Sequence, residues 1–98
     1  MAAQRWTVLL YLCGDTPAIA TSIKADADEV LRSKLSDALS VAMFVDLPMD
    51  LEPRGAIRYV VCSDQRPVIE PLGQVDSGST ATFRDFLLWG IRELPAEH

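Results

Sequence analysis

The sequence predicts an α/β fold, in which helices pack against a sheet that contains parallel strands. Two continuous apolar runs, at residues 6–13 and 38–48, have the composition of strands buried on both faces. Between them, apolar residues recur at helical spacing, so we expect two parallel strands joined by a right-handed crossover helix. The link that follows the second run is too short for another crossover, which indicates that the next strand is antiparallel.

The first predicted element is the strand WTVLLYLC, which Gly14 and Asp15 end and which we expect in the middle of the sheet. The first twenty residues also imitate a signal peptide, with Arg5, a short apolar stretch and an Ala-x-Ala at 18–20. This stretch is at the lower limit of length for a signal peptide and follows a single basic residue, so a strand is favoured. A chain that starts directly in a strand favours the cytoplasm, with secretion as the alternative.

A helix is predicted next, from Pro17 to about Leu35. Charged residues lie on one side of it, and its apolar positions recur every three or four residues on the other. These positions are Ile19, Ile23, Ala27, Val30, Leu31 and Leu35. The run ALSVAMFVDLP then forms the second buried strand.

Residues 56–75 are expected to form a β-hairpin. Its strands are AIRYVVC and PVIEPLGQV, and SDQR is the polar turn between them. Pro67 and Pro71 place the second strand at an edge, because proline has no N–H to donate to a neighbouring strand. We expect this hairpin to be an arm beside the main sheet.

The last predicted element is a helix that Ser79 caps and Pro95 ends. Its apolar residues form one stripe, which predicts that the helix covers a face of the sheet. The stripe consists of Phe83, Phe86, Leu87, Gly90, Ile91 and Leu94. A sheet built from these elements alone is narrow and leaves the first strand with an open edge, so we expect the front part of one larger domain.

Composition excludes two classes of partner. The 98 residues include 14 acidic and 9 basic side chains, a formal net charge of −5 that would repel a phosphate backbone. We therefore expect no nucleic acid as a partner. No apolar run reaches the roughly 18 residues that cross a bilayer, so we expect no membrane partner either.

The two cysteines are predicted to be buried, reduced thiols. Cys13 and Cys62 lie in separate apolar runs without CxxC spacing, which disfavours a disulfide or a metal site. Cys13 lies near the end of the first strand, where α/β folds place their sites. Its neighbours Gly14 and Asp15 would not favour a thiolate, so a core position is preferred to a nucleophile.

Three aspartates, Asp15, Asp46 and Asp64, are each expected to follow a strand. Carboxylates gathered at one sheet edge can hold Mg²⁺ for phosphate chemistry. A separate hairpin arm would keep Asp64 away from the other two, so turn and capping roles are preferred. Gly14, Asp15 and Asp46 are candidates to line a cleft, and no metal or other cofactor is expected.

A resemblance rests on three stretches: RWTVLLYLCGD, VAMFVDLP and, above all, LGQVDSGSTATFRDFLLWGIRELPAEH. They are similar to the amino-terminal part of the clostripain-like cysteine peptidases, a family that shares the caspase and gingipain architecture. The last stretch is the most specific, with Leu-Gly-x-Val, a capped turn, and F-x-x-F-L-x-W-G-I before Pro-Ala. Thr16-Pro17 departs from the Asn or Asp pairs that relatives often carry there. The resemblance implies that residues 1–98 are an incomplete, caspase-like three-layer sandwich.

In that family, the strand after the Pro-Ala ends in His-Gly, and a later strand ends in the nucleophilic cysteine. Neither motif occurs in this chain, and His98 is not followed by Gly and precedes the expected strand. The resemblance therefore implies a scaffold without catalytic residues. The His-Cys pair would lie beyond residue 98 and would cleave peptide bonds after basic residues. The implied partners are the carboxy-terminal part of the same peptidase and a protein or peptide substrate.

Two alternatives from other functional classes stay open. The chain could be a non-catalytic α/β module whose open sheet edge accepts a partner strand, which predicts a stable fold by itself or a defined dimer. It could also be a Mg²⁺-dependent phosphate-binding domain that uses the aspartates. That alternative predicts stabilisation by Mg²⁺ that is lost on Asp15→Asn.

Overall fold

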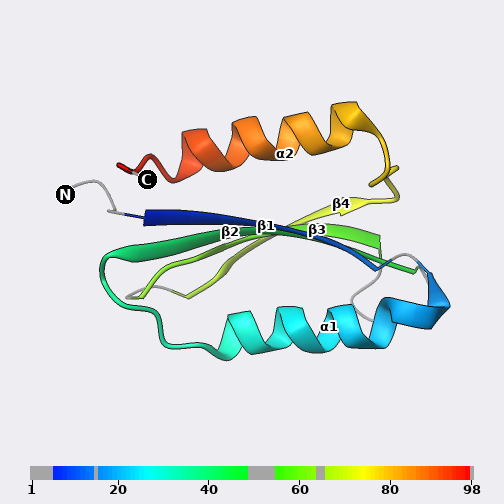
Figure 1. The fold of residues 1–98 in the computed structure, drawn as a ribbon, viewed down its shortest axis with the longest axis horizontal. Coiled ribbons are helices and arrows are strands. Elements are labelled where there is room, and N and C mark those ends of the chain that lie inside the picture. The colour runs from blue at the N-terminus through cyan, green and yellow to red at the C-terminus, as the bar shows by residue number, and fades with distance from the viewer. Residues whose placement is uncertain (1–5, 15, 49–54, 64–65, 98) are drawn as a thin grey trace.

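The structure, a computed structural model, describes residues 6–14, 16–48, 55–63 and 66–97. Four strands form one mixed sheet, and the two helices lie on its opposite faces as the outer layers (Figure 1). The elements in chain order are β1 (Trp6–Cys13), α1 (Pro17–Arg32), β2 (Leu39–Leu47), β3 (Gly55–Val61), β4 (Val68–Gly73) and α2 (Thr80–Glu93). The predicted α/β class is confirmed.

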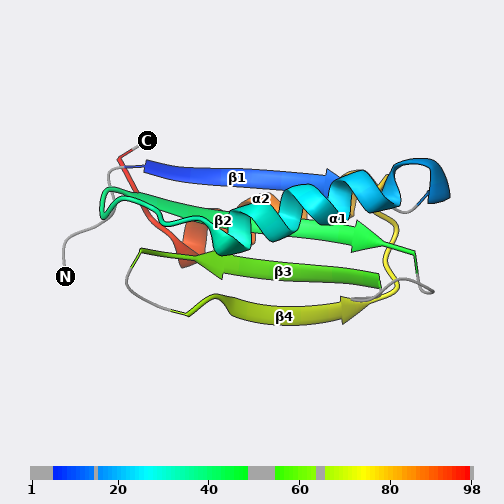
Figure 2. The ribbon, with the colours of Figure 1, turned by 90° about the horizontal axis from the view of Figure 1, so that it is seen from below.

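The sheet has the order β1-β2-β3-β4, with the strands side by side as Figure 2 shows. β1 and β2 are parallel, with Trp6 opposite Leu39 and Cys13 opposite Asp46, and α1 connects them as predicted. The prediction that β1 is the middle strand is wrong for the described sheet, because β1 lies at its edge. β2 is central instead, and all of its residues from 40 to 47 are buried.

The hairpin is part of this sheet, so the prediction of a separate arm is wrong. β3 is antiparallel to β2, with Val41 opposite Val61, and β4 is antiparallel to β3. The short link after β2 returns the chain directly alongside β2, where β3 pairs along most of its length. β4 is the other edge strand, and Pro71 lies in it opposite Ile57, as predicted.

Helix α1 covers one face of the sheet. Its buried Ala27 belongs to a cluster that includes Met43 of β2 and Tyr59 of β3. The helix ends at Arg32, three residues earlier than predicted, since Ser33 already has an extended backbone. Leu35 still packs against the same cluster, so the apolar pattern continues beyond the end of the helix.

Helix α2 covers the other face. Ser79 caps it as predicted, because its side chain accepts a hydrogen bond from the backbone N–H of Ala81. Its buried residues are Phe86, Trp89 and Gly90. Two members of the predicted stripe are exposed instead, Phe83 at 41% and Ile91 at 60%. In the described part of the chain, neither helix is long and apolar enough to cross a membrane.

Candidate functional site

The carboxyl ends of three strands meet at one edge of the sheet. β1 is parallel to β2, and β4 runs the same way as β2 because each is antiparallel to β3. Both α1 and α2 begin at this edge (Figure 1). We call it the carboxyl edge and define it by residues 13–14, 46–47 and 74–79. It consists of strand ends and is distinct from the two sides of the sheet formed by the edge strands β1 and β4. In α/β folds, ligands and catalytic groups gather at such an edge, because loops and helix N-termini are free to vary there.

Tyr11 connects the sheet to the loop that precedes α2. Its hydroxyl donates a hydrogen bond to the carbonyl oxygen of Ser77 at 2.8 Å. Its ring stacks on Phe44 with 4.5 Å between centroids, and Phe83 meets it edge-on at 4.9 Å. Burial raises the pKa of the phenol above its usual 10.0, and the nearby Cys13, Asp46 and Asp76 raise it further. Tyr11 therefore remains a neutral hydrogen-bond donor at physiological pH.

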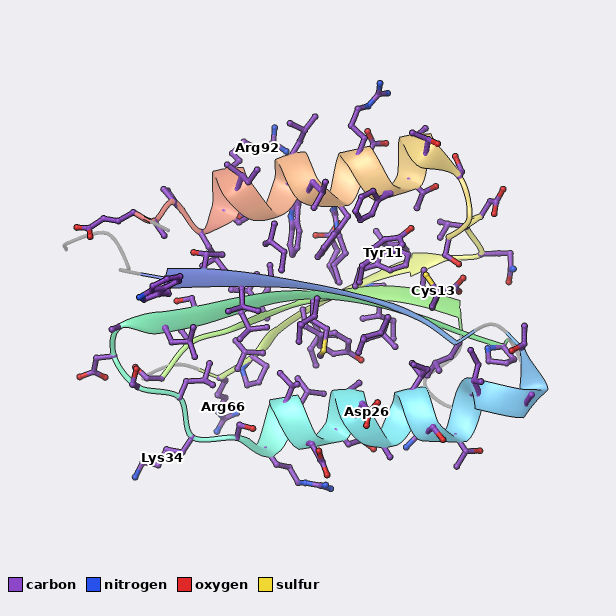
Figure 3. The ribbon with its side chains drawn as sticks, viewed as in Figure 1. Tyr11, Cys13, Asp26, Lys34, Arg66 and Arg92 are labelled. Carbon is purple, nitrogen blue, oxygen red and sulfur yellow. The ribbon has the colours of Figure 1, made fainter. Side chains whose placement is uncertain are left out.

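Cys13 is exposed, so the prediction that its thiol is buried is wrong. Cys13 is the last residue of β1, and β1 is an edge strand. The strand end and the edge position each leave the thiol with fewer neighbours to cover it. Figure 3 shows Cys13 and Tyr11 on the α2 side of the sheet. The Cys13 sulfur lies 4.0 Å from the Ser77 carbonyl oxygen. Cys62 is half-buried, with its sulfur 3.5 Å from the Ser40 hydroxyl, and neither cysteine forms a disulfide.

Gly14 is held between α1 and β2. Its N–H donates to the backbone oxygen of Asp46 at 2.7 Å. A Cβ atom at Gly14 would lie 2.8 Å from Cβ of Ile23, so only glycine allows α1 to approach this closely. Asp46 was predicted to follow the second strand but lies within β2. It is buried, with 1% of its surface exposed. That both residues line a cleft stays a prediction.

The remaining aspartates of the alternative magnesium arrangement, Asp15 and Asp64, lie outside the described residues, as does His98. Across the ranges that the structure does describe, no three His, Cys, Asp or Glu side chains are grouped so that they could hold a metal ion. The magnesium arrangement thus stays an untested alternative, because two of its three aspartates lie outside the described residues.

The loop between β4 and α2 forms a polar wall of the carboxyl edge. Asp76 organises it, since its side chain accepts a hydrogen bond from the N–H of Gly78 at 3.0 Å and its carbonyl accepts from the N–H of Ser79. A shallow hollow of about 370 Å³ is lined by Gln74, Val75, Asp76 and Ser77. Sequence reasoning missed Tyr11 and this loop. Strand alternation could have found Tyr11, because it predicts that Tyr11 and Cys13 share a face.

Comparison of the chain with protein-family models, curated proteins and solved structures finds no match.

Proposed function

We propose that the chain is the amino-terminal scaffold of a clostripain-like cysteine endopeptidase, with the caspase-like sandwich completed by residues beyond 98. The sequence resemblance suggests the family. The observation that carries the proposal is an unfilled apolar groove beside β1, at the edge where the family resemblance requires a further strand.

The groove lies between β1 and the C-terminal half of α2. Its volume is about 210 Å³, and its lining residues are Thr7, Leu9, Ile91, Leu94 and Ala96. Ile91 is 60% exposed here, although it belongs to the apolar side of the helix that turns toward β1. An exposed apolar residue of a helix beside an edge strand would be covered if the sheet had one more strand there.

The end of α2 lies where such a strand would begin. The Thr7 hydroxyl donates a hydrogen bond to the carbonyl oxygen of Leu94 at 2.7 Å. Ala96, which forms a single β-bridge, lines the groove beside Thr7. In Figure 2 the C-terminal end lies on the outer side of β1, at the start of that strand. A strand that continued from here would run parallel to β1 and would end at the carboxyl edge.

In the proposed peptidase, the residues beyond 98 would supply the catalytic groups and the present chain would position them. A histidine at the end of the added strand would stand at the carboxyl edge, and a later strand would bring the cysteine within its hydrogen-bond reach. Amide hydrolysis would then proceed through a thioester, with backbone N–H groups stabilising the oxyanion. The present chain would hold the edge in place through Gly14 and the Tyr11–Ser77 hydrogen bond.

The test is the reading frame beyond residue 98 together with the activity of the protein it encodes. We expect a strand that reaches His-Gly within about fifteen residues, and later a strand that ends in cysteine. The purified protein should cleave fluorogenic peptide amides after Arg or Lys and lose activity when that cysteine is changed to Ala. Residues 1–98 alone should be inactive. A reading frame that contains neither motif would refute the proposal.

One alternative function would use the same free side of β1. A non-catalytic module could accept a partner strand at β1, through main-chain hydrogen bonds and the groove that Ile91 lines. Sedimentation of the purified protein at several concentrations separates the two. The module predicts a defined dimer or complex that disperses when Leu9→Pro removes strand pairing, whereas the peptidase predicts a monomer whose own chain fills the groove.

A further inference from the structure

The two outer strands of the sheet differ in how readily they can pair with a further strand. β1 and β4 form its opposite sides (Figure 2). An exposed strand edge is a template for pairing with another chain, and proteins protect such edges with prolines, charges or bulges. We infer that Pro67, Pro71 and a bulge close the outer side of β4 to strand pairing, so that the described sheet can be extended only at β1.

The register shows which way the backbone of β4 faces. Pro71 is paired with Ile57 of β3, and a proline in an edge strand turns its nitrogen away from the neighbouring strand. Backbone N–H groups of alternate residues point to the same side of a strand, so Ile69 also faces outward. Pro67, directly before β4, continues this series. Ile69 is then the outward donor between two prolines, and a strand laid along β4 would lack hydrogen bonds at both flanking positions.

A bulge at the end of β4 further disfavours pairing. Ala56 is opposite Gly73 whereas the next residue, Ile57, is opposite Pro71, so Leu72 is an extra residue on β4. Gly73 has a φ of 74°, in the left-handed region that favours glycine. A bulge bends its strand and increases the local twist. The last part of β4 therefore turns away from a straight partner strand.

The side chains of β4 would otherwise favour association. Val68 and Ile69 lie on opposite faces of the strand, and each is 57% exposed. Glu70 pairs with Arg58, so its charge adds little repulsion against an approaching strand. An exposed apolar edge strand is a predicted site of aggregation. Protection of β4 thus depends on its backbone, which the two prolines and the bulge determine.

β1 has neither form of protection. Its sequence, WTVLLYLC, contains no proline or glycine, and its register with β2 is unbroken from Trp6 to Cys13. The apolar groove that Leu9 and Ile91 line lies beside it. A strand can therefore be added at β1, whereas the outer side of β4 is closed. The inference about β4 does not rest on the proposed function, which concerns the other side of the sheet.

The test is to open the outer side of β4. The double variant Pro67→Thr/Pro71→Thr restores both outward N–H groups through a residue that favours strands. Sedimentation velocity from micromolar to millimolar concentrations compares its mass with that of the unmodified protein, and circular dichroism checks that both are folded. We expect the variant to associate at concentrations at least about tenfold lower, because each restored N–H adds a hydrogen bond to strand pairing. Association no stronger than that of the unmodified protein would overturn the inference.

Two further variants locate the association. Adding Ile69→Lys to the double variant places a charge on the opened strand and should return the mass to that of the unmodified protein. Association that persists in this triple variant would show that the contact lies elsewhere, and would also overturn the inference. Val68→Thr introduces the same residue type into β4 but keeps both prolines, and it should associate no more strongly than the unmodified protein.

A measurement on the unmodified protein needs no variant. The amide of Ile69 should exchange rapidly with solvent, because it faces outward, whereas the amide of Glu70 should be protected, because it faces β3. A protected Ile69 amide beside an unprotected Glu70 amide would mean that the prolines face β3, and the inference would be wrong. Each measurement reports on β4, so each remains valid whether or not a strand is added at β1.

Discussion

At the scale of single residues, exposure depends on where a strand lies in the sheet. Cys13 and Cys62 occur in similar apolar runs, yet only Cys13 is exposed, because it ends an edge strand. The Ser79 cap was predictable, since it depends on residues within one turn of the helix. The buried Trp89 was not, because its environment comes from Arg58 on β3, a partner that helical periodicity does not reveal.

Gly14→Ala should lower the free energy of unfolding by about 1–3 kcal/mol, because the added methyl group would overlap Ile23 and press against the backbone oxygen of Asp46. Urea unfolding measures the change. Gly78→Ala is the control, since the only atom its methyl group would approach is an Asp76 side-chain oxygen at 3.3 Å. Equal losses in both variants would contradict a packing role for Gly14.

Tyr11→Phe should destabilise the protein by about 1 kcal/mol, because it removes the hydrogen bond to Ser77 but keeps the stacking on Phe44. Hydrogen exchange should also become faster in the loop 74–79. The measurements are urea unfolding and amide exchange, and an unchanged loop would show that the hydroxyl does not hold it.

Alkaline pH should destabilise the protein through its two tyrosines. Burial raises the pKa of both Tyr11 and Tyr59 above 10.0, with Asp28 adding to the effect at Tyr59. Above pH 10 the unfolded chain therefore loses these protons first, while the folded chain retains them. The free energy of unfolding should fall as pH rises through this window and be unaffected by these groups below it. Unfolding measured from about pH 8 to about pH 11 should show a shallower fall in Tyr11→Phe/Tyr59→Phe.

At the scale of elements, existence and type followed from the sequence, but position in the sheet did not. Continuous apolar runs predicted β1 and β2, and helical spacing predicted α1 and α2. The runs do not specify which strand is central, because both are strongly apolar. β2 is central because only seven residues separate it from β3, a link so short that β3 pairs with the side of β2 that β1 leaves free.

The role of the groove beside β1 can be tested with two residues of similar size and exposure. Ile91 lines the groove beside β1, and Leu88 is 56% exposed without lining it. If the proposed strand fills the groove, Ile91→Ser should destabilise the full-length protein by about 2–3 kcal/mol and Leu88→Ser by less than about 0.5 kcal/mol. Thermal unfolding gives both values. Equal effects would mean that nothing covers Ile91.

At the scale of the whole molecule, the class and the parallel pairing were predictable, whereas the continuous four-stranded sheet was not. Pro67 and Pro71 predicted an edge strand, and β4 is one, but the hairpin was interpreted as an arm beside the sheet although an edge strand can equally belong to the sheet itself. The carboxyl edge was predictable only in outline, since Gly14 and Cys13 could be placed there while the Tyr11–Ser77 contact joins segments far apart in sequence.

Hydrogen exchange along β1 reports whether the sheet continues. In residues 1–98 alone, only the β1 amides bonded to β2 should be protected, because amides along one side of an edge strand lack a partner strand. In the longer protein that the proposed function implies, we expect protection at almost every β1 amide. The central strand β2 serves as an internal control, and a β1 pattern that is the same in both proteins would argue against an added strand.

The contact between Thr7 and Leu94 also determines when this fold can be completed during synthesis. β2, β3 and β4 pair through short local connections, whereas β1 emerges first and obtains the last part of its cover, at Thr7, only from residues near 94. At about 5–20 residues per second, the ribosome needs about 4–16 s to make the 81 residues between positions 13 and 94. Throughout that interval one face of WTVLLYLC is at least partly uncovered, so this strand is where we expect chaperones to bind the nascent chain.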